Sequence, residues 1–327
     1  MADLVSGARA RPLPKGIGRR LQDRVNRLED EAFGWLLLTP SVLLLLVFLI
    51  GPILYALLMS FQRIELTKGP DRVFNYGANY VRMVEDQQFW ATIPRTVYMA
   101  GLTVALSTLV ALAIALLLND SFKGKTLLQV AILVPWAVAP VANGIFWKFI
   151  FNGSFGILNA VLLRLGLITE YVIWLDDPFK ALNVAVLGDV WKYVPFLALI
   201  LLAALQGIPQ ALYRAARMDG ASAVQAFIHV TLPILAKTIL ILVLIQTTWS
   251  LQVFDLIYVL TKGGPAQGTV VLNYLVFTQA FENLSLGYSA AIAMVLCALI
   301  VACSSLVFVL MLRERRARLN VPREDAL

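Results

Sequence analysis

Two ionisable residues, Asp189 and Lys192, lie inside a long apolar segment of the sequence. A charge at membrane depth is costly unless it is paired or hydrated, and such residues often mark the pathway of a substrate or an ion. Because they are three positions apart, the two side chains share one face of a helix, which Tyr193 and Phe196 extend by about one turn. Two interpretations are open: an ion pair that stabilises a helix bundle, or the polar lining of a cavity.

A second chemical signal lies in the polar stretch 206–233, between two apolar segments. Pro209 fits the first turn of a short helix, where its missing N–H costs least. The residues from Ala211 to Met218 favour helix formation, and Asp219-Gly220 indicates a stop and a turn. We predict a short helix, a sharp turn and a second helix that leads into the next apolar segment.

This short helix has features that would suit a docking surface. Arg214 and Arg217 share one face, since they are three positions apart. The pair Ala215-Ala216 carries little side chain, so another protein surface could approach closely. The alternative is an interfacial helix that only connects two spans.

The composition indicates that a membrane protein carries these residues. Of the 327 residues, 60% are hydrophobic and 14% are charged, and the mean hydropathy is +0.78. A soluble globular chain is nearer half apolar and a quarter charged. This composition excludes a water-soluble enzyme, a disordered protein and a nucleic-acid-binding domain.

A helix needs about 20 mostly apolar residues to cross a bilayer. Six segments meet this condition, and we predict an all-α polytopic membrane protein. Prolines inside the segments do not exclude spans, because neighbouring helices can satisfy the freed backbone groups. The predicted spans are 35–61, 94–118, 126–151, 181–205, 228–254 and 286–312.

Six spans place both ends of the chain on the same side of the membrane. The two tails and the two loops on that side carry sixteen Lys and Arg residues, against seven in the three longer loops on the other side. The positive-inside rule therefore assigns the first set to the cytoplasm. The predicted organisation is a basic cytoplasmic tail (1–34), a spanning domain (35–312) with the cytoplasmic loop 206–233, and a cytoplasmic tail (313–327).

The sequence gives no sign of a metal or nucleotide site. One His excludes a multi-His metal site. Cys297 and Cys303 lie six positions apart and would point to different faces of a helix, so neither a disulfide nor a metal site is predicted. No Gly-x-x-x-x-Gly-Lys-Ser/Thr motif occurs, and the chain therefore lacks a phosphate-binding loop of that type.

The stretch after Leu205 resembles the EAA loop of binding-protein-dependent ABC importers, whose pattern is Glu-Ala-Ala, three residues, Gly, and about nine residues to Ile-x-Leu-Pro. One departure matters: Arg214 stands at the Glu position and inverts the charge. The matching residues are Ala215, Ala216, Asp219, Gly220, Ala221, Leu232 and Pro233.

Further matches narrow the resemblance to the sugar-importing branch, which includes maltose-type, glycerol-phosphate-type and mycobacterial trehalose permeases. The resemblance covers roughly residues 35–312. These matches are Trp147, Phe155-Gly156, Asn159, Trp174-Leu175, Trp191, Pro195, Ala204-Leu205-Gln206, Leu260-Thr261-Lys262-Gly263-Gly264-Pro265, Phe281 and Leu286-Gly287-Tyr288-Ser289-Ala290-Ala291.

The resemblance implies a six-helix bundle of the type I ABC importer permease kind, in a bacterial inner membrane, with a cytoplasmic coupling helix that docks on a separate ATPase. Arg214 then implies either a different pairing with the ATPase or a second permease that retains the Glu. The implied docking residues are Tyr213, Arg214, Ala215, Ala216, Met218, Asp219, Gly220 and Ala221.

The resemblance also implies a sugar site between the fourth and fifth spans. Its polar groups would serve sugar hydroxyls and its rings would pack on C–H faces. Trehalose, maltose-type oligosaccharides and glycerol phosphate all remain open as substrates. The implied residues are Asp189, Lys192, Tyr193, Phe196, Gln246, Trp249 and Ser250, with Gln252 as a neighbour in sequence.

The implied partners are a second permease in a heterodimer, two ATPase copies and an extracytoplasmic sugar-binding lipoprotein, besides membrane lipids. No cofactor is expected in this chain, since ATP and Mg would bind the ATPase. The rival functions are an ion-gradient-driven transporter that uses Asp189 and Lys192, and a scaffold or sensor that transports nothing. Neither rival needs an ATPase-docking loop.

Overall fold

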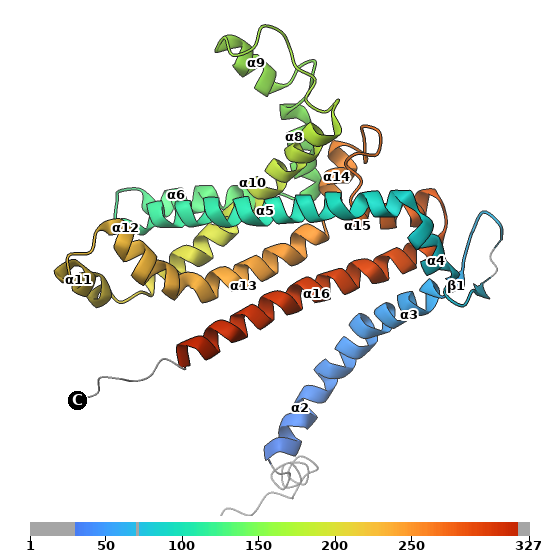
Figure 1. Cartoon of the computed structure of the whole chain (residues 1–327), viewed down its shortest axis with the longest axis horizontal. Helices are drawn as coiled ribbons and strands as arrows, with labels where there is room; N and C mark the ends of the chain where they lie inside the picture. Colours follow the sequence, from blue (N-terminus) through green and yellow to red (C-terminus); the bar gives the residue numbers. More distant parts are fainter. Residues whose placement is uncertain (1–29, 70–71, 320–327) are drawn as a thin grey trace, which may run out of the picture. The chain divides into compact units, whose positions relative to one another are not determined.

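The computed structural model describes residues 30–69 and 72–319, mainly as helices (Figure 1). The chain divides into two compact units, residues 1–56 and 57–327. Most of the predicted tail 1–34 and the end of the tail 313–327 lie outside the described residues. Residues 313–319 continue the last helix.

The first unit holds most of one apolar span, over residues 34–60. It consists of α2 (Asp30–Leu45), the π-helical turn η1 (Leu46–Ile50) and the start of α3 (Gly51–Ser60). The wide turn ends just before Pro52, where a missing N–H and a proline ring disturb an α-helical ladder. The Gly51 N–H accordingly bonds the Leu46 carbonyl, five residues back. The predicted first span is confirmed.

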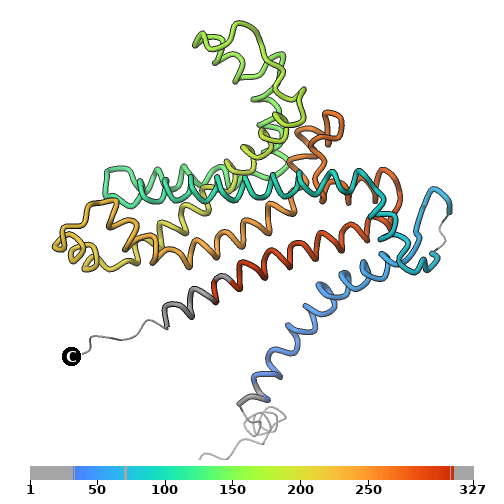
Figure 2. The backbone as a smooth tube through the Cα atoms, in the orientation of Figure 1, coloured from blue at the N-terminus to red at the C-terminus, as the bar shows by residue number. Residues whose placement is uncertain are grey.

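Four long helices build the second unit, and Figure 2 shows α13 and α16 running side by side. α5 packs along α10, and α13 contacts α5, α10 and α16. α10 is the most buried of these helices: 67% of its most apolar 18-residue stretch is buried inside the structure. These helices confirm four of the predicted spans. They are α5 (Gln87–Asn119), α10 (Pro178–Gln206), α13 (Leu232–Leu251) and α16 (Leu286–Leu319).

Small and hydroxyl side chains form much of the buried face of α5. They recur every three or four residues, which allows the close helix approach that is typical of membrane bundles. The residues are Thr92, Thr96, Ala100, Thr103, Ser107, Ala111 and Ala115.

The predicted span 126–151 is wrong as one continuous helix. The chain forms α6 (Lys125–Ile132), α7 (Val134–Ala137) and α8 (Pro140–Ile150), and the axis turns by 95° between α7 and α8. Val138 and Ala139 are extended between them. The residue before a proline avoids the α conformation, so Pro140 ends one helix and begins the next. The described residues therefore contain five continuous candidate spans and one bent pair.

A small hairpin of the second unit packs near the start of α16. Strands β1 (Gln62–Arg63) and β2 (Val73–Phe74) pair antiparallel, and Leu66 N–H bonds Leu284 O at 3.0 Å near the start of α16. Lys68 pairs with Glu65 at 2.5 Å and lowers the pKa of that carboxyl. A Cβ at Gly287 would lie 2.0 Å from the Gln62 carbonyl oxygen, so only glycine fits there.

Shorter elements complete the loops on the two sides. On the side assigned to the cytoplasm lie α11 (Gln210–Met218), α12 (Ala223–Ala226) and the π-helical turn η2 (Phe227–Thr231). On the other side lie α4 (Ala78–Glu85), α9 (Ile157–Arg164), α14 (Asp255–Leu260), α15 (Leu272–Phe277) and the π-helical turn η3 (Thr278–Glu282).

Candidate functional site

A polar cavity of about 170 Å³ lies among α8, α10 and the junction of α13 with α14. It forms where the bent pair α7–α8 meets the two helices that carry the predicted sugar site. The bundle therefore brings charged, amide and aromatic side chains to one place. The lining residues are Pro140, Asn143, Asp189, Lys192, Tyr193, Trp249, Gln252, Val253, Phe254, Asp255 and Leu256.

Asp189 is held by a hydrogen-bonded chain that crosses from α10 to α13. The Ser250 hydroxyl donates to the Asp189 carboxylate at 3.3 Å, and the Gln246 amide donates to the Ser250 hydroxyl at 3.3 Å. All three side chains are buried, with at most 4% of each residue exposed. A buried carboxylate requires such donors, because burial removes its water.

Lys192 is held by a different element. Its ammonium donates to the Val138 carbonyl, which the break before Pro140 leaves free of a helical partner. No ion pair joins Lys192 to Asp189, and the ion pairs among the described residues lie elsewhere, at Lys68 and Lys180. Of the two open interpretations, the arrangement matches the polar lining and not the structural ion pair.

Stacked rings form an aromatic wall beside these charges. Tyr193 and Trp249 stack with centroids 5.0 Å apart, and Phe196 packs on Trp249 at 5.5 Å. Trp136 of α7 stacks on Phe196 at 5.3 Å. The Lys192 ammonium lies 5.7 Å from the Tyr193 ring centroid. Such a wall beside a few polar groups is the usual construction of a small-molecule site.

The seven predicted sugar-site residues therefore come together in two layers. Asp189, Lys192, Tyr193 and Trp249 line the cavity. The other three support them from behind: Ser250 and Gln246 through the hydrogen-bonded chain, and Phe196 through ring packing.

Sequence reasoning missed Asn143 and Asp255, both of which line the cavity. Asn143 is 1% exposed and donates to the Gly188 carbonyl at 3.1 Å. Its side-chain oxygen accepts no hydrogen bond from the residues that the structure describes. An amide three residues after Pro140 in an apolar segment was the available signal, since buried amides usually satisfy both ends.

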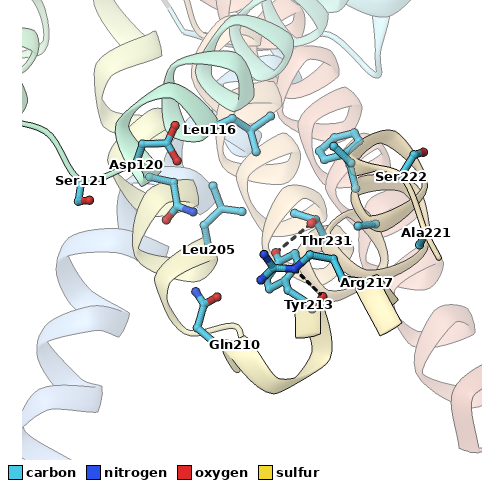
Figure 3. A pocket seen from close by; sticks show the side chains of 14 residues that line it. Leu116, Asp120, Ser121, Leu205, Gln210, Tyr213, Arg217, Ala221, Ser222 and Thr231 are labelled. Atoms are coloured by element: carbon cyan, nitrogen blue, oxygen red, sulfur yellow. Dashed lines mark hydrogen bonds between the residues drawn. The ribbon is translucent and has the colours of Figure 1, made fainter. Parts of the chain in front are cut away.

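The loop 206–233 forms the predicted helix–turn–helix, so that local prediction is confirmed. Helix α11 ends at Met218, and Gly220 follows with a φ of +78°, a conformation that glycine adopts without strain. Ser222 and Gln225 close a capping box at the start of α12. In Figure 3 the Tyr213 hydroxyl meets that of Thr231, 2.9 Å away, which ties α11 to the next span.

Helix α11 has one face that packs against the bundle and one face that is exposed. Tyr213 is half-buried against the bundle, whereas Arg214, Ala215 and Met218 are exposed, Met218 by 88%. Arg217 donates to the Tyr213 carbonyl at 3.3 Å. The exposed face of α11 therefore combines the small side chain of Ala215, the positive charge of Arg214 and the flexible side chain of Met218.

Two pockets flank α11. One, of about 800 Å³, lies between α11 and the ends of α5 and α10 (Figure 3). The other, of about 480 Å³, lies between α11 and the α12–η2 segment. Its lining includes five predicted docking residues, Ala215, Ala216, Asp219, Gly220 and Ala221. Ala221 lines both pockets.

Residues 104–318 match the family described as "Binding-protein-dependent transport system inner membrane component". The match covers most of the chain, and the chain belongs to this family. It is a multi-pass protein of the inner membrane and a component of a transport system. The family match gives no support to the ion-gradient alternative.

The chain is 38% identical over 251 residues to the trehalose/maltose transport system permease protein MalF of Thermococcus litoralis, covering 77% of this chain and 84% of that protein. It is 34% identical over 288 residues to the sulfoquinovosyl glycerol transport system permease protein SmoG of Agrobacterium fabrum, covering 88% and 92%. The resemblance to sugar-importer permeases is thereby confirmed.

Among solved structures, the chain resembles one from a bacterial ABC transporter involved in the import of the acidic polysaccharide alginate. The TM-score is 0.71 at 23% identity, over 93% of this chain and 100% of that chain. The fold is that of an ABC importer permease, as the sequence predicted.

Proposed function

We propose that this chain is the transmembrane subunit of an ATP-driven importer of a di- or oligosaccharide, with trehalose as the first candidate. The observation that carries the proposal is the cavity in which the charges of Asp189 and Lys192 lie beside the Tyr193–Trp249 ring stack. Membership of the binding-protein-dependent family supports ATP as the energy source. The names of the two relatives support a sugar or a sugar derivative.

In this proposal Asp189 accepts from sugar hydroxyls and Lys192 donates to them. Tyr193 and Trp249 pack on the C–H faces of the sugar. Ser250, Gln246 and Phe196 position these groups, and the free acceptor of Asn143 receives a further hydroxyl.

The coupling helix is α11, and the ATPase docks on its exposed face. The docking residues are those predicted from the sequence, Tyr213 to Ala216 and Met218 to Ala221. Tyr213 acts from beneath, because its hydroxyl joins α11 to Thr231 at the start of the fifth span. A displacement of α11 by the ATPase would thus move the helix that carries Trp249.

The complete importer contains a second permease, two ATPase copies and an extracytoplasmic sugar-binding lipoprotein. ATP and Mg bind the ATPase, since this sequence has no phosphate-binding loop of the Gly-x-x-x-x-Gly-Lys-Ser/Thr type. Both termini lie in the cytoplasm, and the chain is organised as the tail 1–34, the spanning domain 35–312 and the tail 313–327. Alternating access then follows from two packings of the bundle that ATP binding and hydrolysis favour in turn.

The test is a pulldown of the tagged chain in mild detergent, with mass spectrometry of the retained proteins and of any sugar released. The expected result is an ATPase, a second permease and a sugar-binding protein. Uptake of ¹⁴C-trehalose by the reconstituted complex should require ATP and persist with a protonophore. Uptake that collapses with the protonophore and needs no ATP would refute the proposal.

A further inference from the structure

Five aromatic side chains form a ladder from the start of α14 to η3, on the side of the bundle assigned to the cell exterior. From Phe281 the centroid distance is 5.1 Å to Phe277, and from Phe277 it is 4.8 Å to Phe254. Tyr258 lies 5.3 Å from Phe277 and 5.4 Å from Phe254. Tyr274 lies 6.0 Å from Phe254 and completes the set.

One end of the aromatic ladder lies at the polar cavity. Phe254 lines that cavity together with Trp249 and Tyr193. The rings therefore continue from the cavity wall toward the outside.

The exposure of the rings rises away from the cavity. Phe254 and Phe277 are half-buried, Tyr258 is 40% exposed, and Phe281 is 70% exposed. Tyr274, at 4%, backs the others. The exposed fraction of the rings thus increases from the cavity wall to the protein surface.

Hydrogen bonds hold the segment that carries the ladder. Asn273 donates to the Gln252 carbonyl at 2.7 Å, beside the cavity. The Ser289 hydroxyl donates to the Val276 carbonyl at 2.7 Å and fixes α15 to α16. The ring positions are thus set by the backbone framework before any ligand arrives.

We propose that Phe254, Tyr258, Phe277 and Phe281 form an aromatic track on which the pyranose rings of an incoming sugar stack between the outer surface and the cavity. The chemistry is that of the cavity wall: apolar C–H faces pack on rings while hydroxyls stay hydrated or bond polar neighbours. Asn273 and Gln252 supply such neighbours along the track. The inference rests on the proposed function and adds an entry site to it.

The direct test uses diazirine derivatives of trehalose and maltose as photoprobes on the complete complex in proteoliposomes. Labelling should map to Tyr258, Phe277 and Phe281 as well as to the cavity, and excess unmodified sugar should suppress both. Labelling confined to the cavity overturns the track and leaves the proposed function standing. A complex that neither transports these sugars nor is labelled by them overturns both.

Leucine variants test the track by transport. Phe277→Leu and Phe281→Leu keep apolar volume for lipid or protein neighbours but remove the ring face. Each should lower maximal ¹⁴C-trehalose uptake about threefold to tenfold, the range expected for one ring contact. Phe277→Tyr, which keeps an aromatic ring at this position, should retain the uptake of the unmodified complex.

The matched control is Phe74→Leu, an exposed ring of the outer hairpin that contacts Phe61 and Tyr76 outside the track. It should retain uptake. Equal uptake by Phe277→Leu, Phe281→Leu and this control would overturn the track, provided the three complexes purify in equal amounts.

Discussion

Asp189 and Lys192 are neighbours in sequence, but each is held by a different part of the bundle. Ser250 of α13 donates to Asp189, and Lys192 donates to the Val138 carbonyl between α7 and α8. A relative movement of these helices would therefore break either contact alone. The freed group would then be available to a sugar hydroxyl. Binding of the sugar would in this way depend on how the helices of the bundle pack.

Ser250→Ala removes the hydroxyl that links Asp189 to Gln246. Hydrogen bonds between membrane helices contribute about 0.6–1.7 kcal/mol, so a drop of that size in stability is expected. Thermal unfolding of the detergent-purified complex measures it. Thr248→Ala is the control, since that hydroxyl donates to the Leu244 carbonyl of its own helix. An equal effect of the two substitutions would contradict a special role for Ser250.

Lys192→Met keeps a long side chain but leaves the Val138 carbonyl without its donor. We expect uptake to fall by about tenfold, because an unpaired buried polar group costs about 1–3 kcal/mol. Lys148→Met is the matched control, since Lys148 lies on α8 and is exposed. Initial rates of ¹⁴C-trehalose uptake compare the two. Normal uptake by Lys192→Met would remove Lys192 from the sugar site.

At the scale of elements, a single turn sets the course of the loop 206–233. Gly220 follows the end of α11 and has a positive φ, and the Ala221 N–H donates to the Ala216 carbonyl at 2.9 Å. This closure sets the angle between α11 and the α12–η2 segment that enters α13. In the proposed function, the turn would determine how a displacement of α11 by the ATPase reaches the spanning helices.

Gly220→Val places a β-branched residue where φ is +78° and strains the turn by about 1–2 kcal/mol. Uptake should fall more than the ATPase activity of the complex, which would mark uncoupling. Gly166→Val is a closely matched control: it has a φ of +70° and equally open surroundings, but it lies on the outer side. Coupled uptake in the first variant, or uncoupling in both, would argue against transmission through this turn.

At the scale of the whole molecule, the features that depend on long sequence patterns could be predicted from the sequence. Apolar runs of about 20 residues located the spans, and the proline, alanines and Asp219-Gly220 located α11 and its turn. The seven sugar-site residues were predicted by resemblance, and the bundle does bring them together. Their role in binding sugar, and that of the docking residues, stay predictions.

The contacts that required three dimensions were not predictable. Pro135 and Pro140 lie in the third predicted span, but the sequence did not predict a 95° turn whose free carbonyl binds Lys192. The three-residue spacing of Asp189 and Lys192 favoured an ion pair equally well. Ser250, from another helix, gives Asp189 its partner instead, and only the packed bundle reveals that choice.

Assembly gives the last prediction. Arg214 is exposed on α11 and forms no ion pair within the described part of the chain, so its charge is available to a partner. We expect it to meet a carboxylate of the ATPase. Arg214→Glu should reduce co-purification of the ATPase by about tenfold, as for a charge-assisted contact of about 1.4 kcal/mol.

The effect of Arg214→Glu should grow at low salt, where repulsion is least screened. Arg164→Glu is the control, because Arg164 is also exposed but lies on α9, on the side assigned to the cell exterior. Its complex should keep the ATPase at every salt concentration. Undiminished retention by Arg214→Glu would mean that Arg214 makes no direct contact with the ATPase. The second permease, with a Glu at the corresponding position, would then carry the polar part of the coupling.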